Sequence, residues 1–198
     1  ALLERACHQR SATLARRSEI QAAVDDELIG TSPQIVAIRN QISQLAQTDK
    51  DLMLEGPAGS GRHTLALLLH RISARKAQPC HLHDCVSAGS LAEIQASLAL
   101  VEQGTLVLQS PARLTAECQR WLGNHLLDQE RKGNKSLRTI ALFDESPEGL
   151  VERHQLMPEL YYFLSQVRLK LPRLVERSCD SSSSRAFSCS ARVCFSRL

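Results

Sequence analysis

The stretch Gly56-Pro57-Ala58-Gly59-Ser60-Gly61-Arg62-His63-Thr64 decides the fold. Residues 51–55, with three apolar residues at the centre, predict a short strand before it, and a Leu-rich segment that predicts a helix over residues 62–73 follows it. A glycine-rich turn between a strand and a helix is the context that a phosphate-binding loop requires. Glycines let successive backbone amides point at one anion, and the N-terminus of the following helix adds a favourable partial charge. We therefore predict that residues 56–64 bind phosphate.

The loop departs from the full phosphate-binding motif directly after its last glycine. The motif has Lys and then Ser or Thr there, whereas this chain has Arg62 and His63. Arginine keeps the charge but is a planar fork instead of a point donor, so it fits poorly between the last two phosphates of a nucleotide. His63 stands where a hydroxyl would hold magnesium. From the loop alone, a glycine-rich turn without any ligand is an equally good interpretation.

Outward from the loop, apolar segments of strand type and of helix type alternate. We expect strands at residues 51–55, 80–84, 105–108, 137–143 and 167–171. We expect helices at residues 1–24, 33–46, 62–73, 91–100, 115–128 and 158–164, with Thr115 capping one of them. Strands separated by helices predict an α/β fold in which helices wrap a parallel sheet.

The two ends of the chain differ from this pattern. Residues 1–24 have only a thin apolar face among many charges, which is typical of a connecting or dimerising helix instead of a core element. Residues 178–198 are Ser-rich, without period, and contain Cys179, Cys189 and Cys194. We expect this tail to be disordered. The abrupt change of composition after Arg177 suggests a truncated or frameshifted gene product.

The bulk composition excludes few classes of protein. With 198 residues, the chain has room for one domain with a proper core, and its net charge of +3 indicates neither nucleic acid nor membrane as a partner. The sequence contains no run of about 18 apolar residues, so it does not predict a membrane-spanning helix. The seven cysteines have no pattern of a disulfide framework, so we expect a reducing, cytoplasmic setting.

One cluster suggests a metal site. In Cys80-His81-x-His83-Asp84-Cys85, strand alternation would place Cys80 and Asp84 on one face of the strand. It would place His81, His83 and Cys85 on the opposite face. The spacing is not that of a zinc site, and we predict no metal there.

Short segments between residues 27 and 177 carry a family resemblance. They are Glu27-Leu28-Ile29-Gly30 with Ser32-Pro33, the loop itself, Gln103-Gly104-Thr105-Leu106-Val107-Leu108, Glu159-Leu160-Tyr161-Tyr162 and Leu171-Pro172-x-Leu174-x-Glu176-Arg177. In this order they resemble the central AAA+ domain of sigma-54-dependent (NtrC-type) activators, the bacterial enhancer-binding proteins. The degenerate pattern looks most similar to regulators of phosphoglycerate and dicarboxylate transport.

The resemblance implies an architecture and a ligand. The fold would be an AAA+ three-layer sandwich with a parallel five-stranded sheet over residues 25–177, without the helical lid that normally follows. Residues 1–24 would be the linker helix that follows a receiver domain. Ile29, Gly30 and the loop would bind ATP or ADP, and Asp144 would stand where a polar sensor residue faces the γ-phosphate. A solvated turn is an equally good interpretation of Asp144.

The departures from the family concern hydrolysis. Gln109 and Ser110 stand where the magnesium strand should end in two acids, so the main electrostatic contribution to phosphoryl transfer is absent. Asp84 stands where Asn usually precedes the Cys of the second strand. The arginine fingers fall near Met157 and Phe163. The signature of the sigma-contacting loop is missing between Cys85 and Gly104, and neither the lid nor the DNA-binding helix-turn-helix follows residue 177.

The resemblance therefore implies a transcriptional regulator of a two-component system with a nucleotide-binding core and little or no ATP hydrolysis. ATP or ADP would bind weakly, and the binding would depend little on magnesium. The chain would self-associate as an AAA+ oligomer or through its linker helix. RNA polymerase would be a partner of the full-length protein, and DNA would be bound only through the missing helix-turn-helix. The alternatives are an active ATPase that remodels sigma-54 RNA polymerase, and a small-molecule P-loop kinase.

Overall fold

The structure, a computed structural model, describes residues 2–28, 33–131 and 136–172 of the chain. Its strands are β1 (Leu52–Glu55), β2 (Cys80–Asp84), β3 (Thr105–Gln109), β4 (Arg138–Phe143) and β5 (Arg168–Lys170). Its helices are α1 (Leu2–Glu27), α2 (Pro33–Leu45), α3 (Arg62–Ile72), α4 (Leu91–Leu100), α5 (Ala116–Arg131), α6 (Pro147–Glu152), α7 (Pro158–Leu164) and the 3₁₀ turn η1 (Pro111–Arg113). No helix within these ranges is both long and apolar enough to cross a membrane.

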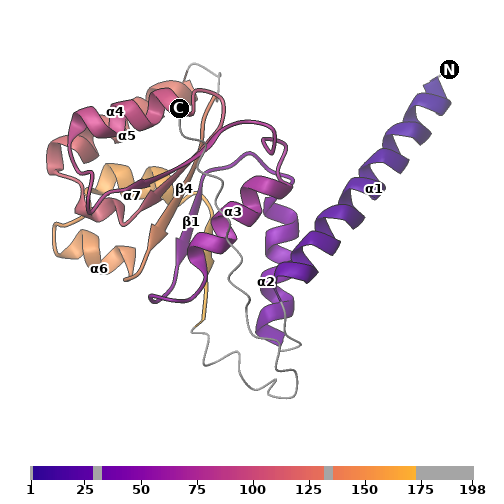
Figure 1. Cartoon of the computed structure of the whole chain (residues 1–198), viewed down its shortest axis with the longest axis horizontal. Coiled ribbons are helices and arrows are strands. Elements are labelled where there is room, and N and C mark those ends of the chain that lie inside the picture. The colour runs from indigo at the N-terminus through magenta and orange to yellow at the C-terminus, as the bar shows by residue number, and fades with distance from the viewer. Residues whose placement is uncertain (1, 29–32, 132–135, 173–198) are drawn as a thin grey trace, which may run out of the picture.

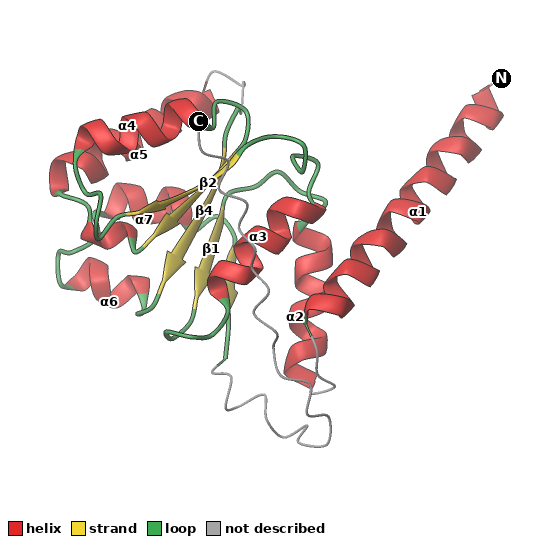
Figure 2. Cartoon of the chain, in the orientation of Figure 1, coloured by secondary structure: helices red, strands yellow, loops and turns green. Residues whose placement is uncertain are grey.

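The strands form one parallel sheet in the order β2-β3-β4-β1-β5. The expected parallel five-stranded α/β fold is therefore confirmed, and each strand lies within one residue of its predicted bounds. All arrowheads in Figure 2 point toward one edge of the sheet, so the loops that follow the strands meet there. Ligands of open parallel sheets bind at that carboxyl edge.

Alternation along the strands divides the core into two layers. Leu52 and Leu54 of β1 face the helices α1, α2 and α3, whereas Met53 between them faces α4, α5 and α7. Figure 1 shows these two sets of helices on opposite sides of the sheet. The result is a three-layer sandwich in which both faces of the sheet are apolar, as a parallel sheet requires.

The first helix differs from the expectation for residues 1–24. Its last turns belong to the core, because Ile20, Val24 and Leu28 are buried against α2 and α3. Its earlier turns extend away from the domain in Figure 1, and Leu14 is 64% exposed there. The helix thus extends away from the domain in its first part and is a core element at its end.

Two short elements, η1 and α6, were not predicted from the sequence. Both begin with a proline and are too short to show a helical period. The predicted cap is present, since the Thr115 hydroxyl accepts a hydrogen bond from the Cys118 amide at 3.3 Å. Ile29, Gly30 and the tail 178–198 lie outside the described residues.

A buried polar network holds the amino edge of the sheet. The Asp51 carboxylate accepts a hydrogen bond from the Thr139 amide at 2.7 Å, tying β1 to β4. Arg138 is fully buried, and its guanidinium donates to the Lys50 and Leu45 carbonyls at 3.2 Å each. Since buried charges need partners, we interpret this network as structural. It lies at the amino edge of the sheet, away from the carboxyl edge at which ligands of such sheets bind.

Acidification below about pH 6.5 should lower the free energy of unfolding through His70. His70 is buried, with its Nδ1 atom 2.9 Å from the Thr105 hydroxyl. Burial, opposed by the Gln78 carbonyl and reinforced by the charge of Arg138, lowers its pKa. The unfolded chain therefore binds a proton at a higher pH than the folded chain does. Stability that is present above the unfolded pKa is lost as the pH falls through the folded one.

Urea unfolding at several pH values measures this effect. The variant His70→Gln removes the titrating group, so its stability should depend less on pH in this range. If the free energy of unfolding fell equally steeply with pH in both proteins, His70 would not be the cause of the loss.

Candidate functional site

The loop between β1 and α3 has the backbone geometry of an anion cradle. Gly59 and Gly61 adopt left-handed conformations, with φ of 77° and 85°, which L side chains rarely adopt. Gly56 is needed for space, because a Cβ atom there would lie 2.7 Å from the Ser60 hydroxyl and 3.0 Å from the Leu171 carbonyl. The Gly56 amide also donates to the Phe143 carbonyl at 3.0 Å, which fixes the start of the loop against β4.

The N-terminus of α3 opens onto this loop. Its N-cap residue is Gly61, so no side chain caps the helix. The first backbone amides of a helix have no acceptor within the helix, and together with the helix dipole they attract an anion. His63 and Thr64 are exposed in this first turn.

Arg62 provides the positive charge of the site. Its side chain is half-buried, and its Nη1 atom is buried with no hydrogen-bond partner among the described residues. Burial lowers the pKa of Arg62, whereas the carboxylate of Asp144 acts in the opposite direction. A buried donor without an acceptor costs about 1–3 kcal/mol and calls for an explanation. An anion bound at the loop would supply the acceptor.

The structure brings the other predicted site positions to the same edge of the sheet. Gln109 ends β3, and Ser110 follows it in a left-handed conformation with φ of 52°. The Ser110 amide donates to the Leu142 carbonyl of β4 at 3.0 Å. Asp144 follows β4 directly and is exposed.

This edge suits phosphate better than magnesium. The left-handed glycines, the open helix N-terminus and the unpaired Arg62 donor all fit an anion. Gln109 and Ser110 provide no carboxylate, and within the described ranges no three His, Cys, Asp or Glu side chains gather where a metal ion could be held. Magnesium prefers carboxylate and water oxygens, so the residues present do not form a site for it.

A cavity of about 400 Å³ opens beside Asp144 between the end of β3, α5 and α6. The Gln119 side chain holds its wall, because it donates to the Leu114 and Gln155 carbonyls at 2.9 Å and accepts from the Met157 amide at 2.8 Å. Met157, near which the resemblance would put one arginine finger, lines the cavity.

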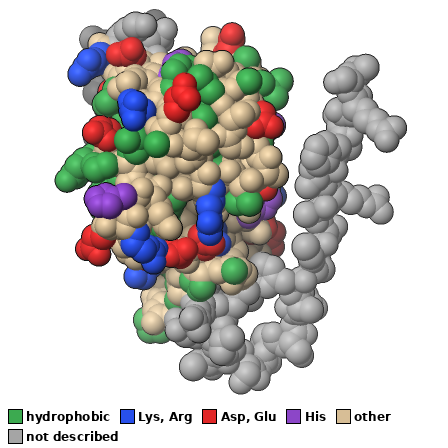
Figure 3. Space-filling view, turned by 90° about the vertical axis from the view of Figure 1, so that its left-hand side faces the viewer, with side chains coloured by type: hydrophobic (Ala, Val, Ile, Leu, Met, Phe, Trp, Pro, Cys, Tyr) green, Lys and Arg blue, Asp and Glu red, His purple; other side chains and the backbone are tan. Residues whose placement is uncertain are grey.

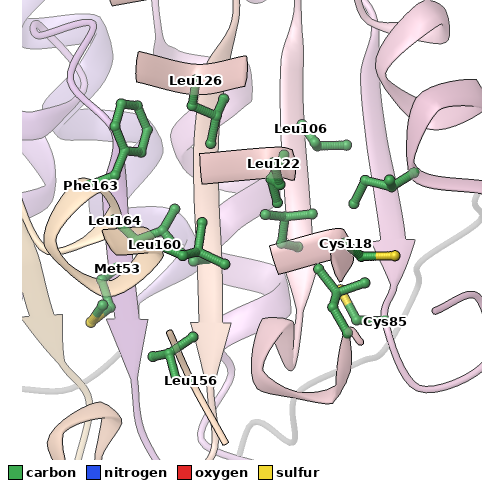
Figure 4. Close-up of a cluster of buried hydrophobic side chains, with 14 of the residues drawn as sticks. Met53, Cys85, Leu106, Cys118, Leu122, Leu126, Leu156, Leu160, Phe163 and Leu164 are labelled. Atoms are coloured by element: carbon green, nitrogen blue, oxygen red, sulfur yellow. The ribbon is translucent and has the colours of Figure 1, made fainter. Parts of the chain in front are cut away.

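The other finger position, Phe163, is only 6% exposed. Figure 4 shows it among the core side chains of α7 and α5, near Leu160 and Leu126. The Phe163 side chain therefore belongs to the core.

A charged network beside the loop was not predicted from the sequence. Glu55, the residue before the loop, is buried and bound to Arg168 at 3.0 Å and to Lys170 at 3.1 Å. Arg168 also pairs with Glu148 of α6. The hydrogen bond from Arg168, aided by the Ser146 hydroxyl, lowers the pKa of Glu148 to about 2. The alternating charges of β5 were the available signal, but their partners are far away in sequence.

The Cys/His segment of β2 is divided between the two faces of the sheet. Cys80 packs against the α1–α3 layer and Cys85 belongs to the opposite layer, as alternation predicted. Burial raises the pKa of Cys80 to about 11 and is the main reason why that of Cys85 rises to about 12. His83 is bonded to Ser97, at 2.8 Å. A thiol must lose its proton to bind a metal ion, and burial opposes that loss at both cysteines.

The outer face of the domain carries mixed charges. Figure 3 shows acidic and basic side chains interspersed with hydrophobic ones on the side formed by α4, α5 and α6. Nucleic-acid contact requires a continuous basic surface, and this face does not provide one.

Comparisons with known proteins agree with this geometry. The family model "Sigma-54 interaction domain" matches residues 29–174. The phosphoglycerate transport system transcriptional regulatory protein PgtA of Salmonella typhimurium is 28% identical over 179 residues, which are 90% of this chain and 42% of the relative. A Nif-specific regulatory protein of Bradyrhizobium diazoefficiens is 27% identical, over 90% of this chain and 34% of the relative. The chain thus spans less than half the length of these curated relatives.

Two solved structures are similar as well. The P-loop NTPase domain of the sigma-54 transport activator from E. coli superimposes with a TM-score of 0.63 and 29% identity, over 74% of this chain and 99% of that one. NtrX from Brucella abortus in complex with ATP superimposes with a TM-score of 0.69 and 26% identity, over 87% of this chain and 44% of that one.

Proposed function

The chain belongs to the sigma-54 interaction domain family, and we propose that it is the nucleotide-binding AAA+ core of a bacterial transcriptional regulator with impaired or absent ATP hydrolysis. The observation that carries the proposal is the buried, unpaired Nη1 atom of Arg62. It lies at the open N-terminus of α3, directly after two left-handed glycines. A phosphate group bound there would satisfy the guanidinium and the first amides of the helix together.

The residues that remain bind and orient a nucleotide but do not polarise it. The loop amides and Arg62 would hold the last phosphates of ATP or ADP. Magnesium, when bound to a nucleotide, neutralises the charge that develops during phosphoryl transfer. Gln109 and Ser110 give it no carboxylate ligand, and Phe163 and Met157 give a neighbouring subunit no cation for the transition state. We infer a module that binds nucleotide as a signal or a structural ligand.

The regulatory setting rests on the relatives. The name of PgtA describes a transport system transcriptional regulator, which supports a role in the regulation of transport or carbon-source uptake. The proposal further places the protein in a two-component system in the cytoplasm. The extended first part of α1, with Leu14 exposed, supports self-association through this helix. Contacts with RNA polymerase, and DNA binding by a helix-turn-helix, would belong to the full-length regulator.

Nucleotide titration by calorimetry, with and without magnesium, tests the proposal together with an assay of phosphate release. We expect weak ATP binding that depends little on magnesium, and turnover far below the order of 1 per second that is ordinary for an enzyme. Backbone amides bind phosphate without a metal, which is the reason for the first expectation. Strong magnesium dependence with turnover of that order would instead support an active ATPase that remodels sigma-54 RNA polymerase.

A further inference from the structure

We infer that Asp144 is a specificity-determining residue that makes this site prefer a nucleoside diphosphate over a nucleoside triphosphate when magnesium is absent. The inference rests on the proposed nucleotide site and adds a preference that neither the loop nor the family assigns to this chain. It is carried by the position of Asp144, by the pairing of the carboxylates around it and by the charge that it faces.

The sheet register places Asp144 beside the loop. Glu55, the last residue of β1, is paired with Phe143, the last residue of β4. The next residue of β1 is Gly56, whose amide donates to the Phe143 carbonyl at 3.0 Å. Asp144 is therefore opposite the first residue of the phosphate loop, on the sheet edge toward which the loop opens.

Asp144 acts on the same cation that a phosphate would use. Its negative charge interacts with the guanidinium of Arg62. In phosphate-binding loops, the basic residue after the last glycine reaches the last two phosphates of a triphosphate. A terminal phosphate at Arg62 would thus be close to a second anion that attracts the same cation, and the two anions repel one another.

The neighbouring carboxylates are already neutralised. Glu55 is bound by Arg168 and Lys170, and Glu145 pairs with Arg153. Asp144 has no ion-pair partner of this kind within the described part of the chain. Unlike these two carboxylates, that of Asp144 is not neutralised by an ion pair with another described residue, so its charge can act on a ligand at this edge.

The Asp144 side chain is exposed, and it also lines the cavity of about 400 Å³ on the side of α5 and α6. The discrimination is electrostatic, and it should weaken as salt screens the charges.

Calorimetric titration of the full chain with ADP and with ATP, in EDTA, tests the inference. For the unchanged protein we expect ADP to bind several-fold to about tenfold more tightly than ATP. Asp144→Asn should raise the affinity for ATP and bring this ratio close to one, with Asp144→Ser as a second neutral variant. The matched control Glu145→Gln removes the adjacent carboxylate, which is already paired, and should keep the original ratio.

Salt provides a readout without any substitution, because the ratio for the unchanged protein should shrink between about 50 mM and about 500 mM NaCl. Equal affinities in the unchanged protein, or a ratio that both neutral variants leave intact, would overturn the inference while the nucleotide site stands. If none of the proteins binds either nucleotide, the proposed function and this inference both fail.

Discussion

Gly104→Ala should lower the free energy of unfolding by about 3 kcal/mol or more, although the substitution adds only a methyl group and removes no functional group. A Cβ atom on Gly104 would lie 1.9 Å from the Pro79 carbonyl oxygen and 2.9 Å from its carbon. That oxygen accepts the hydrogen bond from the Thr105 amide at 2.9 Å, next to the first pair of β2 and β3. To relieve the clash, the edge strand must move away from β3.

Gly149→Ala is the matched control. Gly149 lies in α6, and a Cβ atom there would meet nothing within 4 Å. In a helix, alanine costs less conformational entropy than glycine, so we expect a gain of about 0.5–1 kcal/mol. Urea midpoints of the two variants give the comparison. A loss below about 1 kcal/mol for Gly104→Ala would mean that the turn shifts without breaking the pairing of β2 and β3.

The sequence was sufficient for the strands because their signals are local. The strands β1, β3 and β4 are short runs rich in apolar residues and bounded by turn residues, and β5 alternates in character. The alternating layers around Leu52, Met53 and Leu54 follow from the period of two. The short elements η1 and α6 escaped because three to six residues do not show a period.

The end of α1 escaped for another reason. Ile20, Val24 and Leu28 are spaced four residues apart and form a regular apolar stripe. The many charges earlier in the helix conceal this stripe when the segment is judged as a whole. Only the packing of α2 and α3 shows that the stripe is part of the core.

The candidate site could be predicted in part. The loop is contiguous in sequence, and its glycines and basic residue indicate phosphate without any tertiary knowledge. The relation between Asp144 and Arg62 depends on the position of β4 beside β1, which the order of segments along the chain does not specify. The same holds for Glu55 and Arg168, which are 113 residues apart in sequence and hydrogen-bonded at 3.0 Å.

Arg62→Ala should weaken nucleotide binding to this domain by about tenfold to a hundredfold, which for a weak ligand amounts to loss of measurable binding. A hydrogen bond to a charged group contributes about 1.5–3 kcal/mol, and each 1.4 kcal/mol corresponds to a factor of ten. Arg62→Lys keeps a positive charge as a point donor and should retain most of the affinity. Arg71→Ala removes an exposed basic side chain from the last turn of α3, at the opposite end of the helix from the loop, and serves as the control.

The stability of the same variants separates a binding role from a structural one. In the folded protein the Nη1 atom of Arg62 is buried without a hydrogen-bond partner in the described part of the chain. Arg62→Ala removes that cost, so the free energy of unfolding without nucleotide should stay the same or rise. A functional residue that is kept at the expense of stability gives this combination of unchanged folding and lost binding. A parallel loss of stability and affinity would make Arg62 a structural residue, and unchanged affinity would assign phosphate binding to the loop amides alone.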